Sequence, residues 1–197
     1  MVIIKKYKRI RDYKKLKQLL LNEKRWSFGA HESGLNKNEC IDLYIFVELC
    51  NSDKTIVALD EKNNLLGIIA IDYLKRKKIK QILANIAIKI FCLHLTKEQR
   101  NGIYEYYYGT QKAYERKPIQ ESSITLFMID TKKRKMGIGK QLLKEAENYL
   151  RQKKIRNIGV NTDSCCDYQF YEKNGYRRVF ENQFNDDELY FYVKEIL

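Results

Sequence analysis

Residues 122–150, SSITLFMIDTKKRKMGIGKQLLKEAENYL, decide the fold of this chain. They begin with an apolar run that is typical of a buried strand and end with apolar residues at helical spacing. The loop between them contains Gly137 and Gly139, which let the backbone approach a ligand without an intervening side chain. The first amides of a helix have no partner within it, and the helix dipole adds positive charge there. The segment therefore predicts a site for a phosphate group.

Basic side chains surround the two glycines, and the familiar phosphate motifs do not fit them. A P-loop requires Ser or Thr after Gly-Lys, but Gln141 follows Lys140, and Arg134 stands at the place of its first glycine. A dinucleotide fingerprint that begins at Gly137 requires glycine where the chain has Leu142. For the two glycines alone, a loop with solvated lysines remains the simpler interpretation. The basic residues of the loop are Lys132, Lys133, Arg134, Lys135 and Lys140.

Outward from this stretch, the last eighty residues alternate between strands and helices. Alternation of this kind predicts a parallel pair of strands with a right-handed crossover inside a mixed sheet. The expected elements are a strand at 123–129, a helix at 137–153, a strand at 155–161, a short helix at 167–174 and a closing hairpin at 177–193 that turns near Asp186.

The amino-terminal part predicts a strand, two helices and a hairpin. Tyr13, Leu16, Leu19 and Leu20 fall at helical spacing after a short strand at 2–7, and a second helix is expected at 38–49. Strands at 55–59 and 65–73 form the hairpin, which is followed by a helical region at 75–118. In that region Thr96 and Gln99 form a capping box for a helix through Tyr114, and Pro118 ends it.

Two elements together resemble the GNAT family of N-acetyltransferases. The first is Arg134-x-x-Gly137-x-Gly139 after an apolar strand, and the second is DYQFYEKNGY at 167–176, close to the FYEKxGF signature of that family. Over 122–197 the resemblance rests on specific motifs, whereas over 1–74 it rests only on the expected arrangement of strands and helices. It implies an α/β (α+β) fold: a mixed, mostly antiparallel central sheet of about seven strands with a splayed parallel pair, flanked by helices. The chain would form one domain, 1–197, with 75–118 as a helical insertion between the third and fourth strands.

The resemblance also implies a site for acetyl-CoA, the co-substrate. The pantetheine arm would pair with the backbone of the fourth strand, and the pyrophosphate would lie on the loop amides. Tyr171, in the second motif, would donate a proton to the leaving thiolate. Ser164 stands where many relatives carry an asparagine that contacts the cofactor. The expected cofactor-binding residues are Phe127, Met128, Ile129, Arg134, Lys135, Met136, Gly137, Ile138, Gly139, Lys140 and Ser164.

Catalysis also requires a base for the attacking amine, and the motifs supply none. Gly159 occupies the position where some relatives carry a glutamate. Glu32, Glu121 and Asp163 are candidates by chemistry alone, and a water-mediated route is equally consistent with the sequence. A nucleophilic role for the Cys165–Cys166 pair would require a lowered thiol pKa and a covalent route unlike the direct transfer of the family.

The expected reaction is direct attack of the primary amine of a small molecule on the acetyl thioester. Acetylation of a protein or peptide amine, acetylation of an aminoacyl-tRNA amine, and a non-catalytic CoA-binding domain are the alternatives. The helical insert and the segment Trp26–Glu32 would form the walls of the acceptor pocket. Tyrosines that either line this pocket or pack between helices are Tyr104, Tyr106, Tyr107 and Tyr108.

Composition limits the partners and the location. The formal charge of +13 fits a polyanionic ligand and leaves nucleic acid open as a partner. Five cysteines without a CxxC pair and only two histidines predict no metal site. No apolar run reaches the roughly 20 residues that cross a bilayer, and no leader pattern is present. We therefore expect a cytoplasmic protein without a membrane partner, and the sequence leaves a homodimer open.

Overall fold

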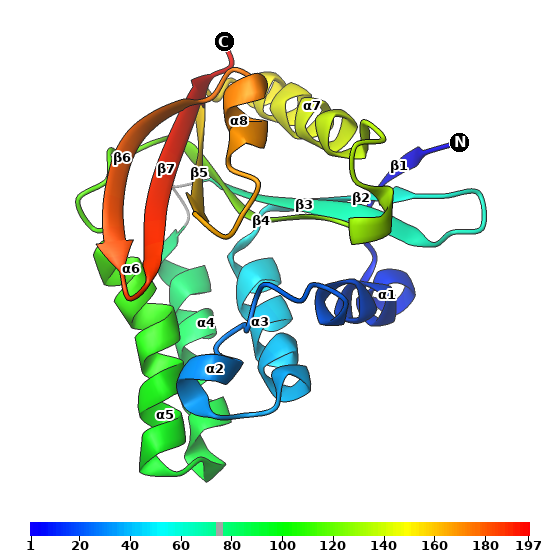
Figure 1. Cartoon of the computed structure of the whole chain (residues 1–197). Coiled ribbons are helices and arrows are strands. Elements are labelled where there is room, and N and C mark those ends of the chain that lie inside the picture. Colours follow the sequence, from blue (N-terminus) through cyan, green and yellow to red (C-terminus); the bar gives the residue numbers. More distant parts are fainter. Residues whose placement is uncertain (74–76) are drawn as a thin grey trace.

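A seven-stranded sheet forms the centre of the computed structural model, which describes residues 1–73 and 77–197 (Figure 1). The strand order is β1-β2-β3-β4-β5-β7-β6, and only β4 and β5 pair in parallel. This confirms the predicted mixed sheet with one parallel pair. The strands are β1 (Ile3–Lys6), β2 (Lys54–Leu59), β3 (Leu65–Tyr73), β4 (Ser122–Ile129), β5 (Asn157–Asp163), β6 (Arg177–Phe184) and β7 (Asp187–Glu195).

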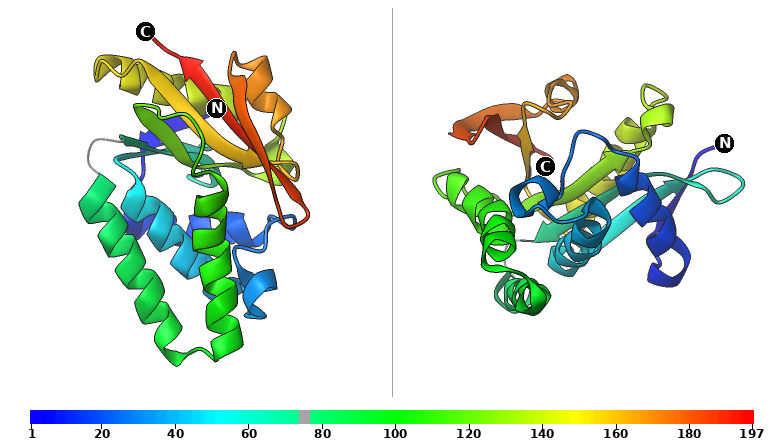
Figure 2. Two further views of the ribbon diagram at one scale, coloured as in Figure 1. Left: turned by 90° about the vertical axis from the view of Figure 1, so that its left-hand side faces the viewer. Right: turned by 60° about the horizontal axis from the view of Figure 1, so that its bottom comes forward.

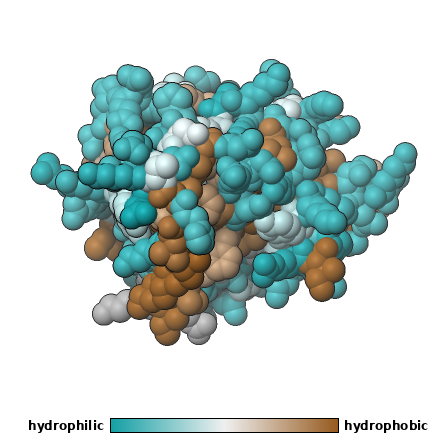
Figure 3. Space-filling view, turned by 90° about the horizontal axis from the view of Figure 1, so that it is seen from below, coloured by the Kyte–Doolittle hydropathy of each residue, from teal (hydrophilic) through white to brown (hydrophobic). Residues whose placement is uncertain are grey.

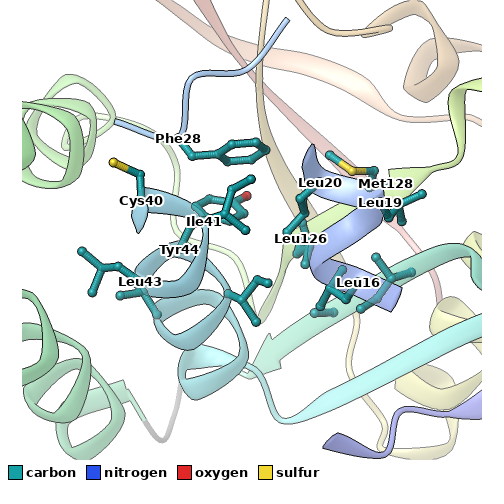
Figure 4. Close-up of a cluster of buried hydrophobic side chains, with 14 of the residues drawn as sticks. Leu16, Leu19, Leu20, Phe28, Cys40, Ile41, Leu43, Tyr44, Leu126 and Met128 are labelled. Atoms are coloured by element: carbon teal, nitrogen blue, oxygen red, sulfur yellow. The ribbon is translucent and has the colours of Figure 1, made fainter. Parts of the chain in front are cut away.

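Helices cover both faces of the sheet. One face carries α7 (Ile138–Gln152) and the short α8 (Gln169–Lys173), and the other carries α1 (Arg9–Leu21), α2 (Ala30–Ser33) and α3 (Lys37–Asn51) (Figures 1 and 2). Strand side chains alternate between the two cores, as the period of two requires. Figure 4 shows the core beneath the sheet, where Leu126 and Met128 of β4 meet α1 and α3.

A bulge at Thr125 changes the direction of β4. Ala70 of β3 pairs with Leu126 and the next residue, Ile71, pairs with Ile124, so Thr125 has no register partner. As a result, Ile124 and Leu126 point into opposite cores although they lie two residues apart. Bulges bend a strand and increase its local twist. The bulge coincides with the end of the β4–β5 ladder, whose last pair is Ile124 with Val160.

The region between β3 and β4 is helical, as predicted, although residues 75 and 76 of the expected insert lie outside the described residues. Its helices extend away from the sheet on the side of α1–α3 (Figure 2). The capping box of Thr96 and Gln99 is confirmed. The elements are α4 (Lys77–Phe91), η2 (Cys92–His94), α5 (Lys97–Tyr104), η3 (Glu105–Gly109) and α6 (Thr110–Ala113).

The predicted helix through Tyr114 is present, but it contains a π-turn that the sequence did not indicate. Between α5 and α6 the chain forms η3, a π-helical turn of five residues that contains three of the four clustered tyrosines. A π-turn inserts one extra residue into the helical repeat and turns the following side chains to a new direction, and such turns are frequent at functional sites. Tyr106 and Tyr107 of this turn pack against the core beneath the sheet.

Helix α4 presents apolar side chains in two directions. Ala84 and Ile88 are buried in the core that α4 shares with α3. On its other side α4 exposes the apolar residues Ile79, Ile82, Leu83, Ile86 and Ile90. They contribute to the apolar surface that is visible from below (Figure 3).

Candidate active site

A cavity of about 1800 Å³ opens where β4 and β5 separate. Its walls come from parts of the chain that are distant in sequence: the 23–32 segment, α3, the helical insert, β4, the glycine loop and the end of β5. Small-molecule sites typically measure roughly 300–1,000 Å³. The cavity therefore has room for a large cofactor and a second ligand together.

One wall of the cavity is an open strand edge. Strand β4 continues to Ile129 along β3, but its pairing with β5 ends at Ile124. The edge of β4 from Thr125 onward has no strand on its β5 side within the described residues, whereas β5 continues to Asp163 paired with β7 alone. An open edge presents unpaired backbone N–H and C=O groups that bind an extended ligand. The expected cofactor residues Phe127, Met128 and Ile129 lie on this segment and line the cavity.

The start of α7 forms the adjoining wall. Gly137 is the N-cap residue with φ 75°, a left-handed conformation that favours glycine, and no described side chain caps the helix. Ile138, Gly139 and Lys140 line the cavity, so the first amides of α7 remain available to an anionic ligand. A Cβ atom at Gly139 would lie 3.3 Å from the Phe170 ring, so the backbone packs closely there.

Arg134 connects the glycine loop to the 23–32 segment. Its Nη2 lies 2.5 Å from Oε2 of Glu23, a carboxylate that also accepts hydrogen bonds from Arg25. Burial alone would raise the pKa of Glu23, but the hydrogen bonds from Arg25 and Arg134 outweigh burial and lower the pKa to about 2. Glu23 is therefore ionised at neutral pH and holds the two walls of the cavity together. Lys133 and Lys135 add positive charge to this wall.

Two expected cofactor residues do not line the cavity. The hydroxyl of Ser164 accepts a hydrogen bond from the backbone N–H of Glu188, and the Ser164 N–H donates to the carbonyl of Glu188. The side chain of Met136 is 62% exposed on the outer side of the loop. Met136 was expected to bind the cofactor through its backbone amide, so the exposure of its side chain does not bear on that expectation. Ser164 was expected to bind through its side chain, which instead forms a hydrogen bond with β7.

Tyr171 lies on α8 at the meeting point of β4 and the glycine loop. It lines the cavity, and its ring contacts those of Phe127, Phe170 and Tyr176. Burial raises the pKa of its hydroxyl well above the ordinary value, with smaller contributions from Cys166 and Asp163. The hydroxyl therefore keeps its proton at neutral pH and has a proton to donate.

The vicinal cysteines are protonated thiols. A hydrogen bond to the Asp187 carboxylate, together with burial, raises the pKa of Cys165 to about 11. Burial and the neighbouring Asp163 raise the pKa of Cys166 to about 12. A nucleophilic thiol requires a lowered pKa, so neither cysteine is poised for covalent catalysis.

The three candidate bases are separated by the structure. Glu121 lies outside the cavity and accepts a hydrogen bond from the Arg156 amide. Glu32 and Asp163 both line the cavity. Burial raises the pKa of Asp163, which brings it closer to that of a useful base. The Ser27 hydroxyl donates a hydrogen bond to Glu32.

A fourth acid in the cavity, Glu48 of α3, was missed by the sequence reasoning. It lines the cavity, as do Tyr44, one turn earlier on the same helix, and Tyr106 and Tyr107 of η3. A signal was present, because Glu48 shares the apolar face of α3 with Ile41 and Tyr44. Of the clustered tyrosines, Tyr106, Tyr107 and Tyr108 line the cavity and all four pack against the core beneath the sheet.

Within residues 1–73 and 77–197, no group of three or more His, Cys, Asp or Glu side chains is placed to hold a metal ion. None of the helices in these ranges is long and apolar enough to cross a membrane.

Comparisons with known proteins agree with this geometry. Residues 108–193 match the model of the acetyltransferase (GNAT) domain, and no curated protein matches the sequence. Over the full length of both chains, the structure is similar to a GNAT-family acetyltransferase from Staphylococcus aureus Mu50, with 16% identity and a TM-score of 0.58. A mosquito arylalkylamine N-acetyltransferase like 5b has 11% identity and a TM-score of 0.65, with 99% of this chain and 100% of that chain covered.

An aminoglycoside 6′-N-acetyltransferase complexed with coenzyme A is also similar, with 16% identity and a TM-score of 0.58. The similarity covers 99% of this chain and 97% of that chain. At such identities these similarities establish the fold.

Proposed function

We propose that this chain transfers an acetyl group from acetyl-CoA to the primary amine of a small molecule, because residues 108–193 match the acetyltransferase (GNAT) domain and the whole chain has the fold of a GNAT-family acetyltransferase. Two features that meet at one cavity carry this proposal. They are the open edge of β4 beyond Ile124 and the available amides at the start of α7.

The two features match the two ends of acetyl-CoA. The pyrophosphate would lie on the amides of residues 135–140, where Lys135 and Lys140 supply positive charge. The amide-containing pantetheine arm would extend along the open edge of β4, as an added strand would. The thioester would then reach the region of Phe127 and Tyr171, whose rings are in contact.

In the reaction, the neutral amine attacks the thioester carbonyl, the new C–N bond forms, and the C–S bond breaks. The amine nitrogen loses a proton and the leaving thiolate gains one. Tyr171, which holds its proton, would donate to the thiolate, and Asp163 would accept the proton of the amine directly or through water. Both residues line the same cavity.

The walls of the cavity favour a small acceptor. The segment Trp26–Glu32 and the helical insert both line it, as expected for parts that surround a ligand. A peptide or an aminoacyl-tRNA would have to reach the thioester past the insert. Peptides and charged tRNA are therefore tested beside small amines, and a higher turnover of a peptide or a charged tRNA would reject the small-molecule proposal.

The decisive experiment combines acetyl-CoA binding by calorimetry with a turnover screen across small amines, peptides and charged tRNA. Gly139→Trp is expected to abolish both binding and turnover, since the rings of Phe170 and Phe127 already lie 3.3 and 3.6 Å from the position of its Cβ and leave no room for an indole. Gln152→Trp, exposed at the far end of α7, is the matched control and should bind normally. Binding without turnover of any amine would reject the enzyme proposal, and absence of binding would reject the cofactor site.

A further inference from the structure

The cavity is also lined by a carboxylate that no described residue neutralises. Glu48, in the last turn of α3, lines the cavity, and no described side chain or amide forms a hydrogen bond or ion pair with it. Burial raises the pKa of Glu48 to about 8, and burial is its single cause. The side chain is half-buried, and an unpaired carboxylate there is unfavourable because the ion loses part of its hydration without a compensating partner.

No described lysine of the helical insert that lines the cavity forms an ion pair with Glu48. Lys80 of α4 lines the cavity, but its ammonium donates to Asp53 and to the Ser52 carbonyl. Lys117 bonds to Asn161 and lies over the Phe191 ring. Lys112, also on the insert, is exposed. In a chain with a formal charge of +13, the described residues thus leave this acid without a cation.

The walls beside Glu48 are aromatic. Tyr44 lies one helical turn away, and the π-turn of the insert brings Tyr106 and Tyr107 to the same end of the cavity. Burial raises the pKa of each of these hydroxyls, and the charge of Glu48 adds to the effect. Neutral rings around a carboxylate form a site for an organic cation, which gains from both the charge and the ring faces.

Glu48 and Asp163 line different walls of the cavity. Glu48 belongs to α3, whereas Asp163 is the last residue of β5. Tyr171, the expected proton donor, also lines the cavity and belongs to α8. The cavity therefore has one acid on the wall formed by α3 and another at the end of β5. Two separated acids in one cavity match a ligand with two separated positive charges.

Resting on the proposed acetyltransferase function, we propose that the acceptor carries a second positive charge and that Glu48 binds it. The amine at one end of the acceptor reacts near Asp163 and Tyr171. The ammonium at the other end forms an ion pair with Glu48 and lies against Tyr106. The acceptor class is thus a diamine or a longer cationic amine, and Glu48 determines specificity without taking part in the chemical step.

The test compares α,ω-diaminoalkanes of increasing length with n-alkylamines of the same lengths. For the wild-type enzyme, kcat/KM for the best diamine should exceed that of its monoamine by about 10- to 100-fold, the usual effect of one hydrogen-bonded charge. Glu48→Gln should remove this preference, mainly through a higher KM for the diamine, and should lower kcat/KM for the diamine far more than for the monoamine. Glu145→Gln, an exposed acid of α7 outside the cavity, controls for the change in net charge.

Diamine binding is also measured by calorimetry on the CoA-loaded protein in buffers of different ionisation enthalpy. Because Glu48 holds a proton in the empty cavity at neutral pH, a bound cation should release up to one proton from the wild type and none from Glu48→Gln. This readout distinguishes a charge pair from a merely structural role, and it is independent of turnover.

The outcomes separate the two proposals. Equal use of diamines and monoamines, equal loss of both in Glu48→Gln, or diamine binding without proton release would overturn the Glu48 subsite. Absence of turnover with every amine, together with diamine binding that releases a proton, would reject the acetyltransferase proposal and keep the subsite. Failure of diamines to bind at all would reject the subsite alone if monoamines are still acetylated.

Discussion

Gly102 is the point where the helical insert touches the 23–36 segment, and its replacement by alanine gives a quantitative test of that contact. A Cβ atom at Gly102 would lie 2.0 Å from the carbonyl oxygen of Glu32 and 2.5 Å from Cα of Ser33. Ordinary contacts of a Cβ atom begin near 3.4 Å. The obstacle is backbone rather than a flexible side chain, so α5 and α2 must move apart by more than an ångström.

We expect Gly102→Ala to lower the free energy of unfolding by about 2–4 kcal/mol. Overpacking of a tight contact costs roughly 1–3 kcal/mol and more where backbone must shift, while the higher helix propensity of alanine returns up to ~1 kcal/mol. For a chain of this length, that loss corresponds to a melting temperature lower by roughly 5–15 °C. The matched control is Asn101→Ala, which lies on the exposed face of α5 and should be neutral or slightly stabilising.

The assay is urea unfolding of both variants, followed by kinetics with a diamine acceptor and acetyl-CoA. Since α2 and α5 lie on the acceptor side, KM for the amine should rise while the affinity for acetyl-CoA stays close to that of the wild type. Unchanged or increased stability of Gly102→Ala would refute the close packing of these helices. A loss of acetyl-CoA affinity as large as the loss of amine affinity would refute the separation of the two ends of the cavity.

Three further predictions follow from the charged and aromatic groups. The pKa of Glu48 is about 8 in the folded chain and near 4.5 in the unfolded chain, so folding takes up a proton and stability falls as pH rises through this window. Glu48→Gln should therefore be more stable to unfolding than the wild type by roughly 1–3 kcal/mol at pH 8 and by little near pH 5. An equal gain in stability at both pH values would contradict this. Glu23→Gln should lower the free energy of unfolding by roughly 1–3 kcal/mol at neutral pH, because it leaves Arg134 without an ionic partner. The lowered pKa of Glu23 stabilises the fold above pH 4.5, so urea unfolding should show the difference between variant and wild type shrinking as pH falls toward 2. Tyr171→Phe should lower kcat by about 100-fold with unchanged acetyl-CoA affinity, and stopped-flow or steady-state rates equal to wild type would remove its catalytic role.

The carboxy-terminal half of the fold was predictable because its determinants are local. Strand, glycine loop and helix at 122–153 follow from apolar spacing and two glycines, and the structure has β4 and α7 there. The turn of the predicted hairpin at 55–73 is likewise local, because it contains Asn63, a residue type that tolerates positive φ, and Asn63 has φ 59°. Such signals act within a few residues, so the rest of the chain does not alter them.

The bulge and the π-turn were not predictable from those signals. Nothing in the composition of β4 marks Thr125, because the bulge arises from its register with β3. The sequence EYYYG at 105–109 is compatible with an ordinary helix, and its π-turn reflects packing of the tyrosines against the core beneath the sheet. Ser164 shows the same limit: its spacing before Tyr171 suggested a cofactor contact, but hairpin geometry pairs it with Glu188.

Glu48 shows why the acceptor end is harder to read than the cofactor end. The cofactor end uses backbone amides, which every sequence supplies once the loop conformation is set, so a short motif is sufficient to identify it. The acceptor end uses a side chain on α3 that acquires its properties from an insert more than fifty residues later in the chain. An acid in the last turn of a helix would normally be solvated, but burial raises the pKa of Glu48, and the rings of Tyr106 and Tyr107 line the same cavity. If those rings confer the effect, Tyr106→Ala should admit water and bring the pKa of Glu48 back toward 4.5. The proton released on diamine binding would then disappear while the carboxylate remains. Undiminished proton release from Tyr106→Ala would show that α3 itself, and not the insert, sets the charge state of Glu48.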